Sequence, residues 1–283
     1  MLTQDLIKLN NLQLAGKLVS DELMLGVQQS RRSGIGTEFE QFRHYVPGDD
    51  PKRIDWKLFA KTGHHLVRES ATESNQQIRL LLDLSGSMNY AEGKISRLQY
   101  AKILLASLAY LTNRQGDQLS LYALQQGSVK PLVPSGKQAF LKIVAQLEAA
   151  RAEGPWSNQG DVIPEFGRKQ NEMLIIASDF LQVNDEWVNL IQKVAAPRRE
   201  IVLFQLLGDQ ELDFSMSGFY RFQDLETGKE LELQADTIRE TVRQRATDYL
   251  ASLDESLRLP HVRLIRIRLS EPIALVLKQF LLT

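Results

Sequence analysis

The fold of this chain is decided by the stretch Ile78-Arg79-Leu80-Leu81-Leu82-Asp83-Leu84-Ser85-Gly86-Ser87-Met88. Its first half is almost entirely apolar, which is typical of a strand buried on both faces of a parallel sheet. The apolar run is broken by Asp83, and Ser85 and Ser87 follow at alternate positions. Residues i, i+2 and i+4 of an extended backbone share one face, so the three side-chain oxygens are expected to point the same way.

These oxygens are suited to a hard cation. One carboxylate and two hydroxyls form a set that Mg²⁺ or Mn²⁺ accepts, with water or a partner's oxygen in the remaining positions. The same Asp/Ser/Gly pattern also occurs in ordinary strand-to-helix turns, where Ser or Asp caps the helix. The helical apolar spacing of 96–113 is compatible with both interpretations.

A second acid favours the metal site. The apolar run 173–178 also ends in an acid, Asp179. Parallel strands deliver their carboxyl ends to one edge of a sheet, so Asp83 and Asp179 are expected to meet there. The predicted ligands are Asp83, Ser85, Ser87 and Asp179. Because this edge is expected to face solvent, replacing Asp83 by alanine should remove the ion without unfolding the chain.

The remaining pattern predicts an α/β fold with a mainly parallel sheet flanked by helices. Apolar runs predict core strands at 78–84, 118–124, 173–178, 201–207 and 262–269, with an antiparallel edge strand at 129–133. Helical spacing is found at 96–113, 137–150, 186–196, 236–257 and 272–281, and a hairpin is expected at 219–225 and 230–234. The predicted domains are an N-terminal accessory region of helix and short strands, 1–77, and an α/β domain, 78–283.

Composition excludes several classes of protein. The 283 residues contain no cysteine, which removes thiol catalysis, disulfides and thiolate metal sites. A net charge of −1 argues against a nucleic-acid binder that works by bulk electrostatics. No early stretch reads as a signal peptide, and no apolar run reaches the roughly 18 residues of a membrane span. A cytoplasmic protein is the simplest interpretation.

The segment 33–57 is dense in glycine, proline, charge and aromatic residues. From Gly36 to Trp56 it reads Gly-x-Glu-Phe-x-x-x-Arg-x-Tyr-x-Pro-Gly-Asp-Asp-x-x-x-Ile-Asp-Trp, and Leu-Val-Arg-Glu follows at 66–69. Together with Asp-x-Ser-Gly-Ser-Met and the hairpin turn at 224–228, this string resembles the MoxR-associated family catalogued as domain of unknown function 58. The resemblance covers nearly the whole chain.

The resemblance implies a von Willebrand factor A-like fold, in which Asp-x-Ser-x-Ser is the first loop of a metal-ion-dependent adhesion site. Asp179 then corresponds to the acid of the third loop. The second loop departs from the pattern, because residues 154–161 contain no threonine. Asp161 or Ser157 could supply an oxygen instead, although for Asp161 the favoured role is the N-cap of a helix at 162–166. The implied partners are a MoxR-type AAA+ ATPase and a client protein that the sequence does not identify.

Two classes of function are consistent with the site. In the first, a non-enzymatic binding module, the metal joins the chain to a partner's carboxylate during chaperone-like assembly or maturation of other proteins. In the alternative, a metal-dependent phosphatase or hydrolase, the metal at the Asp83 site activates water or holds a phosphate, as in phosphatases whose nucleophile is a strand-end Asp. Such sites typically need a second acid two residues after the first, and here that residue is Ser85. The chain also lacks a glycine-rich phosphate loop ending in Lys-Ser/Thr, so it is not expected to hydrolyse ATP itself. The non-enzymatic module is the prediction.

The aromatic content of 34–56 leads to a further prediction. Phe39, Phe42, Tyr45 and Trp56 would all be exposed in a free linker, and each contributes a few kcal/mol (about 1.5–3) when buried. The segment is therefore expected to pack on the α/β domain as a fixed layer, with Asp49 and Asp50 in its turns or facing the ATPase.

Overall fold

The computed structural model describes residues 3–9, 11–33, 42–44, 59, 66–68, 76–126, 128–136, 138–154, 172–181 and 185–282. The chain divides into two units, one of Met1–Met24 with Gln76–Thr283 and one of Leu25–Asn75. In the second unit, β1 (Phe42–His44) pairs antiparallel with β2 (Leu66–Arg68). Most of 34–56 lies outside the described residues, so the fixed layer predicted there stays a prediction. So does the predicted domain boundary between residues 77 and 78.

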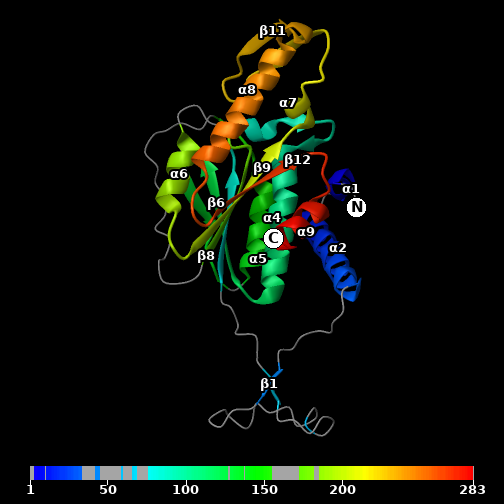
Figure 1. Ribbon diagram of the computed structural model, residues 1–283, viewed down its shortest axis with the longest axis vertical. Coiled ribbons are helices and arrows are strands. Elements are labelled where there is room, and N and C mark those ends of the chain that lie inside the picture. Colours follow the sequence, from blue (N-terminus) through cyan, green and yellow to red (C-terminus); the bar gives the residue numbers. More distant parts are fainter. Residues whose placement is uncertain are drawn as a thin grey trace. The chain divides into compact units, whose positions relative to one another are not determined.

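The first unit is built on a six-stranded sheet with the order β12-β9-β8-β3-β6-β7 (Figure 1). Every neighbouring pair is parallel except β6 with β7, which form an antiparallel edge. The strands are β3 (Gln77–Asp83), β6 (Gln118–Gln125), β7 (Ser128–Val133), β8 (Glu172–Ser178), β9 (Arg199–Leu207) and β12 (Val262–Arg268). The predicted α/β fold with a mainly parallel sheet is therefore confirmed, including the antiparallel edge strand.

The strand order locates the place where a ligand is expected. If the six strands are numbered by their order in the chain, their order across the sheet, starting from the β7 edge, is 3-2-1-4-5-6. This is the strand order of doubly wound folds. The direction of winding reverses between β3 and β8, and ligands bind in such folds outside the carboxyl ends of the strands at this reversal. β3 and β8 are the strands that end at the two predicted acids.

Helices cover both faces of the sheet, which explains why the strands are apolar throughout. Leu80, Leu81 and Leu82 of β3 are all buried. One core cluster joins Leu81 to Trp187 of α6 (Glu186–Val194) and to Leu253 of α8 (Ala235–Ser256). α4 (Arg97–Gln115) packs against α5 (Ala139–Ala149) and α9 (Ile273–Leu282). Ser96 is the N-cap of α4 and forms a capping box with Gln99.

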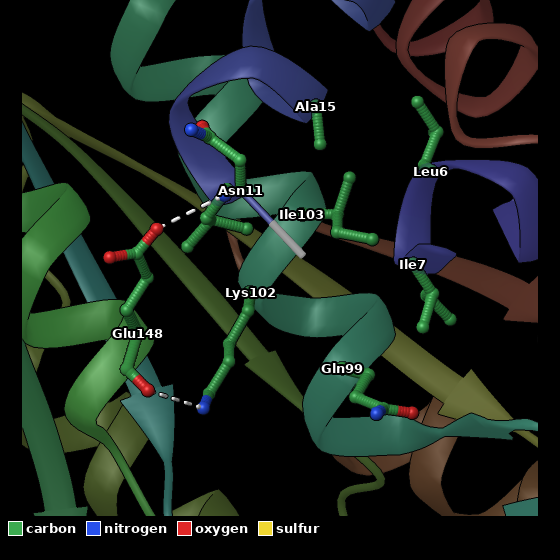
Figure 2. A pocket seen from close by; sticks show the side chains of 9 residues that line it. Leu6, Ile7, Asn11, Ala15, Gln99, Lys102, Ile103 and Glu148 are labelled. Carbon is green, nitrogen blue, oxygen red and sulfur yellow. Dashed lines mark hydrogen bonds between the residues drawn. The ribbon is translucent and has the colours of Figure 1, made fainter. Parts of the chain in front are cut away.

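Two N-terminal helices, α1 (Thr3–Lys8) and α2 (Leu12–Ser33), begin the chain. A cavity of about 340 Å³ lies between α1, the start of α2, α4 and α5 (Figure 2). The Leu12 N–H donates to Glu148 Oε1 at 3.1 Å, and Lys102 Nζ donates to the carbonyl of Ala150 at 2.8 Å. The first bond joins α2 to α5 and the second joins α4 to the end of α5, so the charged groups beside the cavity are already paired.

The first element after β9 is a short helix, and a hairpin follows it. α7 (Asp209–Asp213) was not predicted, whereas the hairpin of β10 (Phe219–Gln223) and β11 (Glu230–Gln234) was. Between β3 and α4 come the 3₁₀ turn η2 (Gly86–Asn89) and the short strands β4 (Ala91–Glu92) and β5 (Ile95–Ser96). Within the described ranges, none of the helices combines the length and apolar character that crossing a membrane requires.

Candidate metal site

The two predicted acids lie on adjacent strands at the reversal point of the sheet. Asp83 is the last residue of β3, and Asp179 directly follows β8, which pairs with β3. Each is only 1% exposed. The meeting of the two strand ends agrees with the sequence, but the expectation that Asp83 faces solvent is wrong. Later segments of the chain cover this edge, as the contacts below show.

Asp83 is held in place by two hydrogen bonds. Its Oδ1 accepts from the backbone N–H of Ser85 at 2.8 Å, and its Oδ2 accepts from Ser178 Oγ at 2.6 Å. Burial, with a further contribution from the Asp179 carboxylate, raises the pKa of Asp83 from 3.8 to about 7. A buried pair of carboxylates favours binding of a cation between or beside them. Ser178 was not singled out in the sequence, although it immediately precedes Asp179.

The serine hydroxyls of the first loop converge. Ser85 has an extended backbone, but the chain turns into η2 at Gly86, so the fully extended loop expected as far as Ser87 is wrong. The two Oγ atoms nevertheless lie 3.0 Å apart, and either can donate to the other. Two oxygens bound at right angles on Mg²⁺, each about 2.1 Å from the ion, are also about 3 Å apart. The hydroxyl pair therefore fits neighbouring positions of an octahedral ion.

A buried arginine, Arg97, joins the site and was missed in the sequence. It is 1% exposed and donates to Asp179 Oδ2 at 2.7 Å and to the carbonyl of Ser87 at 2.9 Å. It also forms an ion pair with Glu211, and its guanidinium carbon lies 4.6 Å from the centre of the Tyr90 ring. Arg97 begins α4, where a cation is unfavourable beside the helix dipole. A basic residue at that position was the available signal that acids are close by.

Glu211 connects the site to α7. Besides its pairing with Arg97, Glu211 accepts a hydrogen bond at Oε2 from the N–H of Gly208 at 2.7 Å. Glu92 accepts from the N–H groups of Asp209 at 2.8 Å and Gln210 at 2.7 Å, so the start of α7 is bound to the β4 strand. These bonds hold α7 over the edge of the sheet and account for part of the burial of the two acids.

The net charge of the site favours a divalent cation. Asp83, Asp179 and Glu211 are three carboxylates, and Arg97 is the one guanidinium paired with them in the described part of the chain. When all three carboxylates are ionised, two negative charges remain uncompensated, and a divalent cation would balance them. Across the described residues, no three His, Cys, Asp or Glu side chains are arranged to hold a metal. An ion here therefore depends on the Ser85 and Ser87 hydroxyls and on water, a donor set that fits Mg²⁺ or Mn²⁺.

The predicted second loop begins beside the first. The N–H of Gly86 donates to the carbonyl of Gly154 at 2.8 Å, and the N–H of Glu153 donates to the carbonyl of Leu84 at 2.9 Å. Asp161 and Ser157, the candidates for a further oxygen, lie outside the described residues. Their predicted roles, including Asp161 as a helix cap, stay predictions.

The hairpin turn is seated against the first loop at Gly86. A Cβ atom at this position would lie 2.5 Å from the carbonyl oxygen of Leu225. We therefore expect Gly86→Ala to displace the turn and to lower the free energy of unfolding by about 1–3 kcal/mol, measured by urea denaturation. Ser87→Ala is the control, because it adds no atom to the same loop. Equal stability of Gly86→Ala and the wild type would show that the turn is not seated there.

Comparisons with known proteins give the family. A family model described as "Protein of unknown function DUF58" matches residues 41–252, more than half of the chain. Two uncharacterized proteins, Rv1480 of Mycobacterium tuberculosis (strain H37Rv) and Mb1516 of Mycobacterium bovis, are each 26% identical over 259 residues, covering 88% of this chain and 80% of theirs. Neither relative's name states a function.

Similar folds occur among solved structures. The conserved hypothetical protein BatB from Bacteroides thetaiotaomicron is 13% identical, with a TM-score of 0.44 over 72% of this chain and 96% of that one. An aerotolerance-related membrane protein from Bacteroides fragilis is 14% identical, with a TM-score of 0.44 over 72% and 95%. The SpRpn10 VWA domain is 9% identical, with a TM-score of 0.39 over 72% and 94%. These similarities concern the fold alone.

Proposed function

The chain belongs to the DUF58 family, and from that premise we propose that it is a non-enzymatic, metal-dependent protein-binding module. One observation carries the proposal: two buried strand-end acids meet where the sheet reverses, beside two hydroxyls 3.0 Å apart. A bound Mg²⁺ or Mn²⁺ would offer an open coordination position to a carboxylate of a partner protein. Ser85 and Ser87 would bind the ion, and Asp83 and Asp179 would supply the charge that retains it.

The proposed partner is a MoxR-type AAA+ ATPase, with which the module would act on a client protein during assembly or maturation. This part of the proposal rests on the family resemblance of the segment from Gly36 to Trp56 and of the Asp-x-Ser-Gly-Ser-Met loop. In this role the protein works in the cytoplasm together with the ATPase. The open coordination position of the metal selects the partner surface, because only a carboxylate or a similar oxygen donor can complete the coordination.

Two observations support a binding role over hydrolysis. Asp83 is only 1% exposed and is held at both oxygens, by the Ser85 N–H and by Ser178 Oγ, so a phosphate in solvent has little access to it. The position two residues later, where a phosphatase of this type needs an acid, is Ser85. We therefore expect no Mg²⁺-dependent hydrolysis of p-nitrophenyl phosphate. Turnover by the wild type that is lost in Asp83→Asn would favour the hydrolase instead.

Metal binding is tested by an isosteric substitution that removes the negative charge of Asp83. Asp83→Asn retains an oxygen that accepts from the Ser85 N–H, so the loop should keep its conformation while the ion loses a charged partner. Isothermal titration calorimetry with Mg²⁺ or Mn²⁺ should show binding to the wild type and none to this variant. Asp5→Asn, at a half-exposed residue of α1, should bind like the wild type. Equal binding by Asp83→Asn and the wild type would show that Asp83 does not contribute to metal binding.

The partner is tested by copurification. The wild type, isolated from its native cells in Mg²⁺, should bring an AAA+ ATPase that mass spectrometry identifies, and the amount should fall when EDTA is added. Asp83→Asn should recover little of the ATPase even in Mg²⁺. Recovery of the ATPase that depends on neither Mg²⁺ nor Asp83 would place the partner contact elsewhere on the chain.

A further inference from the structure

An apolar cavity opens beside the proposed metal site. Its volume is about 300 Å³, and it lies between α7, the middle of α8, the end of β9 and the residues after Asp179. Ligand pockets typically span about 300–1,000 Å³, so this one is large enough for one or two side chains of a partner but small for a large cofactor. Its apolar lining includes Leu181, Leu207, Leu212, Val242, Ala246 and Leu250.

The cavity shares residues with the metal site. Leu181 lines the cavity, and its N–H donates to Asp179 Oδ1 at 3.0 Å. Glu211 also lines the cavity, and its carboxylate pairs with Arg97, which in turn binds Asp179 at 2.7 Å. A group bound at the metal and a group in the cavity are therefore neighbours, close enough to belong to one short segment of a partner.

Two exposed leucines flank the metal loop. Leu181 is 47% exposed on the cavity side, and Leu225, whose carbonyl faces Gly86, is 42% exposed on the hairpin side. Exposed apolar side chains that gather around one site are typical of interaction surfaces. Arg245, at the cavity, is exposed and makes no hydrogen bond or ion pair with any residue in the described part of the chain. Its charge, like that of a bound cation, complements an acidic partner.

We propose that this cavity receives a large aliphatic or aromatic side chain from the same partner segment whose carboxylate binds the metal. The inference rests on the proposed function, and it adds the chemistry of the recognised segment: an acid with an apolar residue at a fixed distance. Arg245 favours segments that carry additional negative charge. Burying one such side chain corresponds to about a 10- to 100-fold gain in affinity.

The experiment uses a library of displayed peptides, each with one fixed Asp and four random residues on either side, selected on the immobilised full-length protein. Selection in Mg²⁺ should enrich Leu, Ile, Met or Phe at one distance from the Asp, and selection in EDTA should not. Replacing that apolar residue by Ala in the best peptide should weaken its binding to the wild type by about 10- to 100-fold.

Two substitutions in α8 locate the effect. Ala246→Trp fills the cavity and should weaken binding of the best peptide by the same factor. Replacing the peptide's apolar residue by Ala should then cause no further loss of affinity for this variant. Thr247→Trp is the matched control, since residue 247 is exposed on the same helix and does not line the cavity. Val242→Asp, which places a charge in the cavity, is a second variant in case Ala246→Trp misfolds. Both cavity variants should bind Mg²⁺ like the wild type by calorimetry.

The outcomes separate the inference from the proposed function. Mg²⁺-dependent selection without an apolar preference, or with unchanged binding to Ala246→Trp and Val242→Asp, would overturn the cavity inference and leave the metal-dependent module standing. Selection that is equal in EDTA would overturn the coupling to the metal and the proposed function with it. A concentration-dependent dimer that Ala246→Trp disrupts would overturn the inference by making a second copy of the chain the occupant.

Discussion

Replacing Arg97 by methionine is expected to lower the free energy of unfolding by about 3–5 kcal/mol in urea denaturation with EDTA present. Arg97 is buried and binds Asp179, Glu211 and the carbonyl of Ser87. Methionine has a similar length but no donors, so the buried carboxylate of Asp179 loses its ion pair. The cost comes mainly from the buried charge that remains, because a carboxylate without a partner is poorly solvated inside a protein.

Arg114→Met is the matched control within the same helix. Arg114 is 52% exposed, and its Nη1 lies 3.6 Å from Asp21 Oδ1, so this surface pair should contribute only about 0–1 kcal/mol. Mg²⁺ should raise the free energy of unfolding more in Arg97→Met than in the wild type. The ion binds only the folded state, and in the variant it meets one more uncompensated negative charge. Equal losses of stability in Arg97→Met and Arg114→Met would show that Arg97 is not a buried cation of the site.

The sequence predicts the sheet well because the relevant signals are local. Apolar runs as long as β3 or β8 identify strands covered on both faces, and the spacing in α4 identifies a helix. The general rule for parallel strand ends then places Asp83 and Asp179 at one edge before any contact is known. The hairpin was predicted for a similar reason, since the turn residues lie between two strand-like segments.

The contacts that complete the site are not local. Arg97 and Glu211 are 114 residues apart, and Ser178 and Asp83 are 95 residues apart, so their pairing depends on the finished fold. α7 has only five residues, too few to show a helical period. Without α7 and the hairpin turn, the edge of the sheet would appear open. The sequence therefore predicted solvent-facing acids where the structure has buried ones.

A second large loss of stability is expected at the opposite end of β8. Glu172 begins this strand, where its Oε1 accepts from Arg79 Nη2 at 2.8 Å and its Oε2 from Arg199 Nη2 at 2.6 Å. Glu172→Gln keeps the shape but removes the buried negative charge that pairs with the partly buried Arg79 and the buried Arg199. We expect the free energy of unfolding to fall by about 3–5 kcal/mol, measured by urea denaturation. Glu232→Gln, in the exposed pair with Arg221, should cost about 0–1 kcal/mol.

Glu172→Gln also separates loss of stability from loss of function. β8 has seven residues, so Glu172 lies about 20 Å from the metal end of the strand at about 3.3 Å per residue. Under conditions where the protein stays folded, this variant should bind Mg²⁺ with the affinity of the wild type, whereas Arg97→Met should not. If both variants changed Mg²⁺ affinity to the same extent, the effect of Arg97 would reflect the general stability of the sheet. A change confined to Arg97→Met would instead assign its charge to the site, because the two substitutions remove comparable ion pairs from opposite ends of the same strand.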